Sequence, residues 1–138
     1  MVLHASEVLI NARGSTVWDV LTDAGNITVW NSGITDLNGD PRDGETVRFT
    51  TPRRDRPVRA RVRQQSGELM TLTSALPLRL LRVVRSFALI PGSGRTLLKV
   101  TVESSGPLRR WSSPTTQQDL DDFVAAARHR AELLDRTS

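Results

Sequence analysis

The segment PTTQQDLDDFVAAARHRAELLD, residues 114–135, decides the fold of this chain. Its apolar residues recur at steps of three and four, which places them on one face of an α-helix. They are Leu120, Phe123, Val124, Ala127, Ala131 and Leu134. At about 1.5 Å per residue such a helix spans roughly 30 Å, the width of a small domain. We therefore expect one long helix that packs on the rest of the chain through a single face.

Both ends of this segment carry helix signals. Ser113 can cap the helix, and Pro114 suits the first helical position because its missing N–H would be unpaired there. Aspartates come early and arginines late, the order that the helix dipole favours. The apolar face is large near its start and small at Ala127 and Ala131. A small-residue face allows a neighbour to approach closely or leaves space for a ligand.

The rest of the chain reads mainly as short strands. Residues 4–11 alternate and predict a strand. A short helix with Ser15 or Thr16 as its cap follows, and a helical turn is expected at 26–30. The further strands are expected at residues 34–37, 47–51, 58–63, 68–74, 80–90 and 96–103.

This order predicts an α+β fold in which a curved antiparallel sheet wraps around the C-terminal helix. In residues 58–63, Val58, Ala60 and Val62 alternate with arginines, as in a strand with one buried face. A sheet with one apolar face needs a cover, and only the last helix is long enough to supply it. The length of 138 residues suits a single domain, 1–138.

Composition excludes several classes of function. The isoelectric point is about 11.1 although the net charge is only +4, since the basic residues are arginines apart from Lys99 and no Tyr or Cys titrates below them. Aromatic residues make up 4%, too few for base stacking, and we expect no nucleic-acid partner. The preference for Arg over Lys is typical of GC-rich bacterial genomes.

The absence of cysteine excludes disulfides, a thiol nucleophile and cysteine-based metal sites, and fits the cytoplasm. The N-terminus does not have the pattern of a signal peptide. The most apolar segment, residues 76–90, contains Pro77, Arg79, Arg82 and Arg85, so we expect no transmembrane segment.

The segment STVWDVLTD at residues 15–23, with Trp30 after it, resembles the SRPBCC superfamily, also called START-like or birch-pollen-allergen-like. Within it, the chain is most similar to the polyketide cyclase/dehydrase branch. The likeness continues through Gly39…Gly44-Glu45-Thr46-Val47, Phe87-Ala88-Leu89-Ile90-Pro91, Arg95-Thr96-Leu97 and Glu103…Gly106-Pro107. Their order and spacing cover nearly the whole chain.

The resemblance implies a helix-grip fold with a hydrophobic cavity between sheet and helix. The superfamily includes lipid and hormone carriers, polyketide aromatase/cyclases and co-chaperone modules, so it implies the fold more strongly than any one activity. If the family fold holds, alternate residues of each strand point into this cavity. The candidate ligand contacts are then Trp30, Phe49, Arg85, Phe87, Val100, Phe123 and Ala127. The alternative is that these side chains fill a solid core.

Arg85 has two possible orientations. It shares its parity with Val83, Phe87 and Leu89, and if that face points inward it is a buried cation that a ligand carboxylate or enolate could pair with. The alternative is an outward arginine, with Val84, Ala88 and Ile90 on the core side.

Three other motifs have simpler interpretations. The arginines at 59, 61 and 63, with those at 53, 54 and 56, are expected on a solvated outer face, although they could bind phosphates or an acidic membrane. Asp36-x-Asn38-x-Asp40 resembles a calcium loop but has Pro41 where glycine is required. His129 is expected to face solvent, and His4 begins the first strand.

The leading hypothesis is a protein that binds a hydrophobic small molecule, such as a lipid, polyketide or aromatic metabolite. The first alternative is a polyketide cyclase or dehydratase in which Arg85 stabilises an enolate. The second is a regulatory module that binds a protein partner through its surface. We assign no catalytic residue, metal ligand or cofactor, and leave monomer and homodimer open.

Overall fold

The computed structural model describes residues 2–23, 36–39, 42–50, 58–65, 67–75, 77–107 and 117–137. In chain order its elements are β1 (Val2–Ile10), α1 (Gly14–Thr22), β2 (Asp36–Asn38), β3 (Thr46–Thr50), β4 (Val58–Gln65), β5 (Leu69–Ala75), the 3-10 turn η1 (Pro77–Arg79), β6 (Arg82–Pro91), β7 (Thr96–Ser105) and α2 (Gln117–Thr137). The expected order of strand, helix, strands and long helix is confirmed. The helical turn expected at 26–30 and the cap at Ser113–Pro114 lie outside the described residues.

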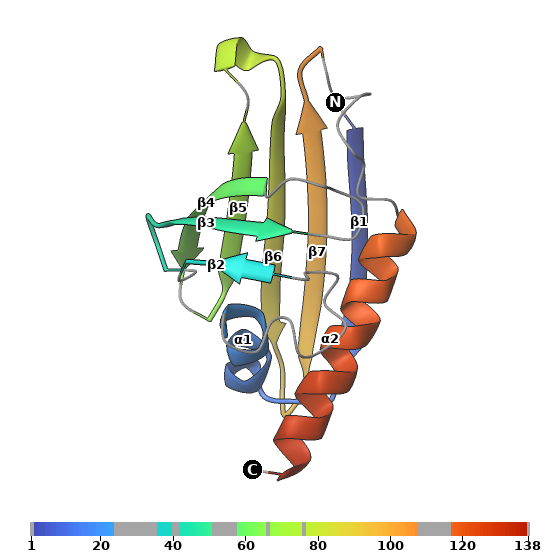
Figure 1. Ribbon diagram of the computed structural model, residues 1–138. Helices are drawn as coiled ribbons and strands as arrows, with labels where there is room; N and C mark the ends of the chain where they lie inside the picture. The colour runs from blue at the N-terminus through green and yellow to red at the C-terminus, as the bar shows by residue number, and fades with distance from the viewer. Residues whose placement is uncertain are drawn as a thin grey trace.

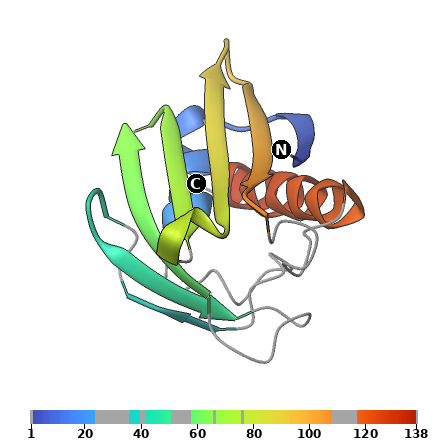
Figure 2. The ribbon, with the colours of Figure 1, turned by 90° about the horizontal axis from the view of Figure 1, so that it is seen from above.

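The strands form one seven-stranded sheet in the order β1-β7-β6-β5-β4-β3-β2, and every neighbouring pair is antiparallel. The sheet is strongly curved, and α2 lies along its β1–β7 side (Figures 1 and 2). Strand β1 is an edge strand beside β7. The predicted helix-grip arrangement, a curved antiparallel sheet with the long helix on its concave side, is confirmed.

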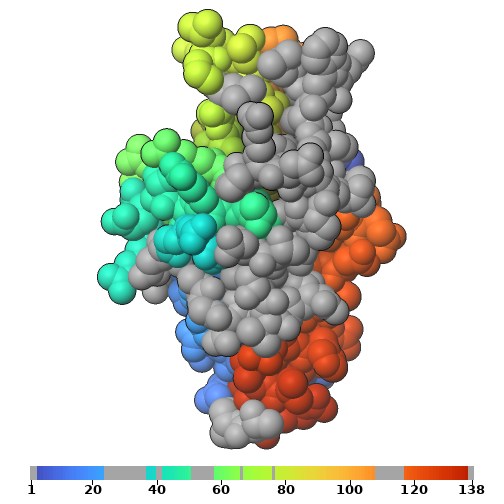
Figure 3. Space-filling view, in the orientation of Figure 1, coloured from blue at the N-terminus to red at the C-terminus, as the bar shows by residue number. Residues whose placement is uncertain are grey.

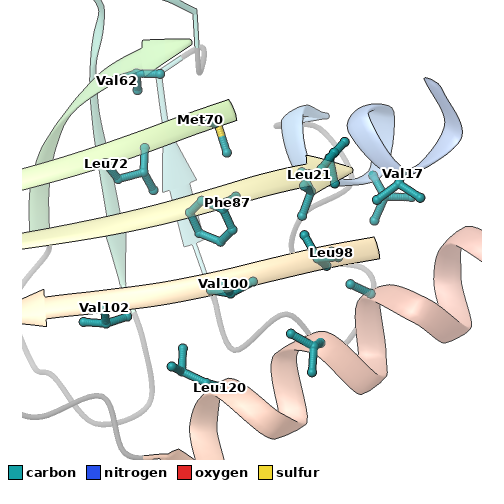
Figure 4. Close-up of a cluster of buried hydrophobic side chains, with 14 of the residues drawn as sticks. Val17, Leu21, Val62, Met70, Leu72, Phe87, Leu98, Val100, Val102 and Leu120 are labelled. Carbon is teal, nitrogen blue, oxygen red and sulfur yellow. The ribbon is translucent and has the colours of Figure 1, made fainter. Parts of the chain in front are cut away.

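The two faces of the sheet follow the alternation of the sequence. In β4 the side chains of Val58, Ala60 and Val62 are buried, and the arginines between them are exposed. In β7 the buried residues are Thr96, Leu98, Val100 and Val102. Figure 4 shows Leu98, Val100 and Val102 of β7 on the same side of the sheet as Leu120 of α2. The buried face covers Leu120, Val124, Ala127 and Ala131 of the helix.

Helix α1 begins differently from the prediction. It starts at Gly14, its N-cap is Arg13, and no side chain caps it. The expectation that Ser15 or Thr16 caps this helix is therefore wrong. The hydroxyl of Thr16 instead donates to Asp135 Oδ1 of α2 at 2.9 Å, because a tertiary partner competes for it.

The N-terminal half of α2 is attached to the middle of β1. The Gln117 side-chain amide donates to the carbonyl of Ala5 at 2.7 Å, and the Ser6 hydroxyl donates to Asp121 Oδ1 at 2.7 Å. An edge strand presents unpaired backbone groups that invite association with other strands. These bonds place helix side chains over that edge.

The C-terminal half of α2 holds the turn between β1 and α1. The backbone N–H of Asn11 donates to Glu132 Oε2 at 2.9 Å, and Arg13 Nε lies 2.9 Å from Asp135 Oδ1. The Asn11 N–H holds the pKa of Glu132 below its ordinary value, and Arg128 lowers it further. The Arg13 side chain and the Thr16 hydroxyl likewise lower the pKa of Asp135.

The Glu132 contact predicts a pH-dependent stability. Because its folded-state pKa is lowered, its contribution is present above the ordinary value of 4.5 and is lost as pH falls through the folded-state pKa. We expect Glu132→Gln to lower the free energy of unfolding near pH 7 by at most about 1 kcal/mol, and to lower it less near pH ~3. Urea denaturation at the two pH values measures this.

The control is Glu7→Gln, which alters an exposed carboxylate on β1 and is expected to leave stability unchanged at both pH values. Equal losses for Glu132→Gln at both pH values would contradict the assignment.

Candidate functional site

The inner face of β6 carries Val83, Arg85, Phe87 and Leu89. The three apolar members are buried, with exposures of 5–8%, whereas Ile90 on the other face is 57% exposed. The alternative with Val84, Ala88 and Ile90 on the core side is therefore wrong. The register explains this, since Phe87 lies between Met70 of β5 and Val100 of β7, both buried.

Arg85 lies among apolar neighbours on the concave side of the sheet. Its cross-strand partners are Leu72 and Val102. Its guanidinium carbon Cζ is 5.3 Å from the centroid of the Phe49 ring, within the range of a cation–π interaction. Its Nη1 atom is buried. The guanidinium therefore lies next to an aromatic face on the inner side of the sheet, where apolar side chains surround it.

The three phenylalanines of the chain all contribute to this interior. The rings of Phe87 and Phe123 lie 5.6 Å apart at 56°, a tilted contact that joins β6 to α2. Phe49 and Phe87 are buried, and Phe123 is partly buried. Ala127 follows one turn later on α2 and is fully buried. Aromatic rings therefore line the concave side around Arg85.

Ser74 adds a polar group that the sequence analysis missed. It lies on the inner face of β5 opposite Val83, two residues beyond Leu72, the partner of Arg85. Its Oγ atom is buried and has no hydrogen-bond partner in the part of the chain that the structure describes. Diagonal neighbours on adjacent strands lie about 7–8 Å apart. The only available signal was its parity with Met70 and Leu72.

Six of the seven predicted ligand contacts lie within the described residues. Arg85 and Phe49 are brought together, and Phe87, Val100 and Phe123 lie together beside them. Ala127 shares the buried face of α2. Trp30 lies outside the described residues.

A separate open groove of about 410 Å³ lies between edge strand β1 and α2. It is lined by Ser6, Glu7, Val8, Asp121, Val124, Ala125, Arg128, His129 and Glu132. His129 is exposed, as expected. The groove has side chains of both charges and does not include Arg85 or any phenylalanine, so it is distinct from the aromatic interior.

The outer face of β3 and β4 is basic. Arg59, Arg61 and Arg63 are exposed as predicted, and Arg48 lies directly opposite Arg59. The other arginines of this group, at positions 53, 54 and 56, lie outside the described residues. Within the described ranges, no group of three or more His, Asp or Glu side chains is placed to hold a metal ion.

The antiparallel sheet, the long C-terminal helix and the lined interior between them define a helix-grip protein of the START-like class. The family model described as "Polyketide cyclase / dehydrase and lipid transport" matches residues 1–132. The chain therefore belongs to this family. No curated protein matches it in sequence.

Solved structures share the fold at low sequence identity. Protein MLL2253 from Mesorhizobium loti aligns with a TM-score of 0.75 at 19% identity and covers 99% of both chains. A START superfamily protein from Mycobacterium smegmatis gives 0.73 at 16%, covering 96% of this chain and 98% of its own. Norcoclaurine synthase from Thalictrum flavum gives 0.73 at 14%, covering 99% and 96%.

The contact between Phe49 and Arg85 can be tested by a double-mutant cycle. We expect Phe49→Leu and Arg85→Met to be coupled by about 0.5–1 kcal/mol in the free energy of unfolding, because each removes one side of the same interaction. Urea denaturation of both single variants and the double variant measures this coupling.

The control cycle pairs Arg85→Met with Val17→Ala in helix α1, and these effects should add. Additive effects in the Phe49–Arg85 cycle itself would show that the ring and the guanidinium do not interact.

Proposed function

We propose that this protein binds a hydrophobic small molecule that carries one acidic group, in the interior between the sheet and α2. The observation that carries the proposal is the position of Arg85, a cation on the concave face among Phe49, Leu72 and Val102. A guanidinium in this position can pair with the carboxylate or enolate of a ligand through charge-assisted hydrogen bonds.

Apolar burial would supply most of the affinity. The rings of Phe49, Phe87 and Phe123 and the aliphatic side chains beside them offer an apolar lining with few polar groups, the usual character of a small-molecule site. Burying about 250 Å² of ligand at about 25 cal/mol per Å² gives roughly 6 kcal/mol before entropy costs. Micromolar affinity is consistent with that magnitude.

Arg85 and Ser74 would orient the ligand. The guanidinium can pair with an anionic oxygen, and the buried Ser74 hydroxyl can donate to a second oxygen of the same group. Because both lie on the concave side, the acidic end of the ligand would point toward strands β5 and β6. Its apolar part would extend along the phenylalanines toward α2.

The family description names both polyketide cyclase/dehydrase and lipid transport. This supports a lipid, a polyketide or an aromatic metabolite as the ligand class.

We further propose that residues 1–138 act as one domain in the cytoplasm. Within the described residues, no helix has the length and apolarity needed to span a membrane.

The second candidate function is a cyclase or dehydratase acting on a polyketide-like substrate. The specific observation in its favour is that Arg85 and Ser74 could also stabilise an enolate oxygen as negative charge develops on it. Norcoclaurine synthase, which has the same fold, has been solved in complex with a transition-state analogue. Formation of product from a bound substrate would distinguish this function from binding alone.

The proposal predicts charge selectivity at Arg85. We expect a long-chain fatty acid to bind about tenfold more tightly than the alcohol of the same length, and Arg85→Met to remove that difference. Ser74→Ala should weaken acid binding about fivefold, as for one lost hydrogen bond. Titration calorimetry of each variant with the acid and the alcohol measures these ratios.

Arg61→Met is the matched control, since Arg61 lies on the exposed outer face of β4 and should leave both affinities unchanged. If Arg85→Met weakened acid and alcohol equally, the guanidinium would not be the anchor of the acidic group.

A further inference from the structure

The turn between β5 and β6 has an unusual backbone. Leu78 and Arg79, in the 3-10 turn η1, have φ values of 60° and 56°. This left-handed region suits glycine and asparagine but costs other residues roughly 1 kcal/mol or more each. Among the described residues, these are the only ones other than glycine with positive φ. Neither the core nor the concave site uses them.

The strained turn presents leucine to solvent. Leu78 is 90% exposed and Leu80 is 37% exposed. Arg79 and Arg82 are also exposed, and residues 77–82 contain no acidic side chain. The turn projects from one end of the molecule (Figures 1 and 3). We call this surface the tip: its apolar residues are Leu78 and Leu80, and its cationic residues, the cationic collar, are Arg79 and Arg82.

The backbone just after β7 packs closely against this turn. Gly106 has a φ of 103°, and a Cβ atom there would lie 2.5 Å from the carbonyl oxygen of Leu80 and 3.0 Å from that of Arg79. The N–H of Leu80 also donates to the carbonyl of Pro77 at 3.3 Å. Leu78 is therefore exposed on a turn whose backbone is packed and hydrogen-bonded.

We propose that this tip docks on an anionic phospholipid surface, with Leu78 and Leu80 entering the interface and Arg79 and Arg82 contacting phosphates. A projecting leucine needs a matching pocket on a protein partner, whereas a fluid bilayer accommodates it without one. The cationic collar complements anionic headgroups. Docking goes beyond the proposed ligand binding and does not depend on what the interior holds.

Co-sedimentation with lipid vesicles tests this docking. We expect the wild-type protein to bind phosphatidylcholine vesicles with about 30 mol% phosphatidylglycerol and to bind pure phosphatidylcholine vesicles much more weakly. Arg79→Gln and Arg82→Gln should each weaken binding about fivefold. Leu78→Asn should weaken it about tenfold.

Leu78→Asn separates docking from folding. Asparagine tolerates positive φ, so the melting temperature should stay constant or rise while vesicle binding falls. Leu133→Asn is the matched control, because Leu133 is a 40% exposed leucine near the far end of α2, and it should bind vesicles as wild type does. The proposal is overturned if the wild-type protein binds neither vesicle, or if Leu78→Asn and Leu133→Asn bind equally. Capture of an acidic protein through the tip without vesicle binding would also overturn it.

Discussion

The attachment of α2 to the edge strand β1 is the constraint on which the rest of the structure depends. An antiparallel sheet with one apolar face is unstable unless that face is covered, and among the described elements α2 alone is long enough to do so. Polar bonds at both ends of α2, from Gln117 to Ala5 and from Asn11 to Glu132, fix the helix along one side of the sheet. From this position the ring of Phe123 reaches Phe87 of β6, and the small residues Ala127 and Ala131 are fully buried.

Arg85 is a charged residue on the inner face of this sheet, at a position where apolar residues are usual. A core built for stability alone would place a leucine or methionine between Leu72 and Val102, because apolar side chains fill such a position without the desolvation of a charge. The buried hydroxyl of Ser74 lies diagonally across the same pair of strands. Proteins depart from the most stable choice mainly at functional sites, and two such departures on one face support a binding site there.

The fold could be predicted from the sequence because its signals were strongly periodic, as in the arginine–valine alternation of β4 and the apolar steps of α2. The orientation of Arg85 could not, because both faces of residues 80–90 carry apolar side chains and only pairing with β5 and β7 decides between them. Ser74 could not be singled out either, because Thr73 beside it is also small and polar and the two residues point to opposite faces of the strand. The role of Thr16 was missed because its partner, Asp135, is distant in sequence.

The central claim, that the interior between the sheet and α2 binds a hydrophobic acid, is tested most directly by native mass spectrometry of the freshly purified protein. The native mass should exceed the denatured mass by a discrete amount, and the released molecule should be an acid. In the Arg85→Met variant, the extra mass should be absent or much reduced. A bare chain that also fails to take up any fatty acid or aromatic polyketide added to it would contradict the claim.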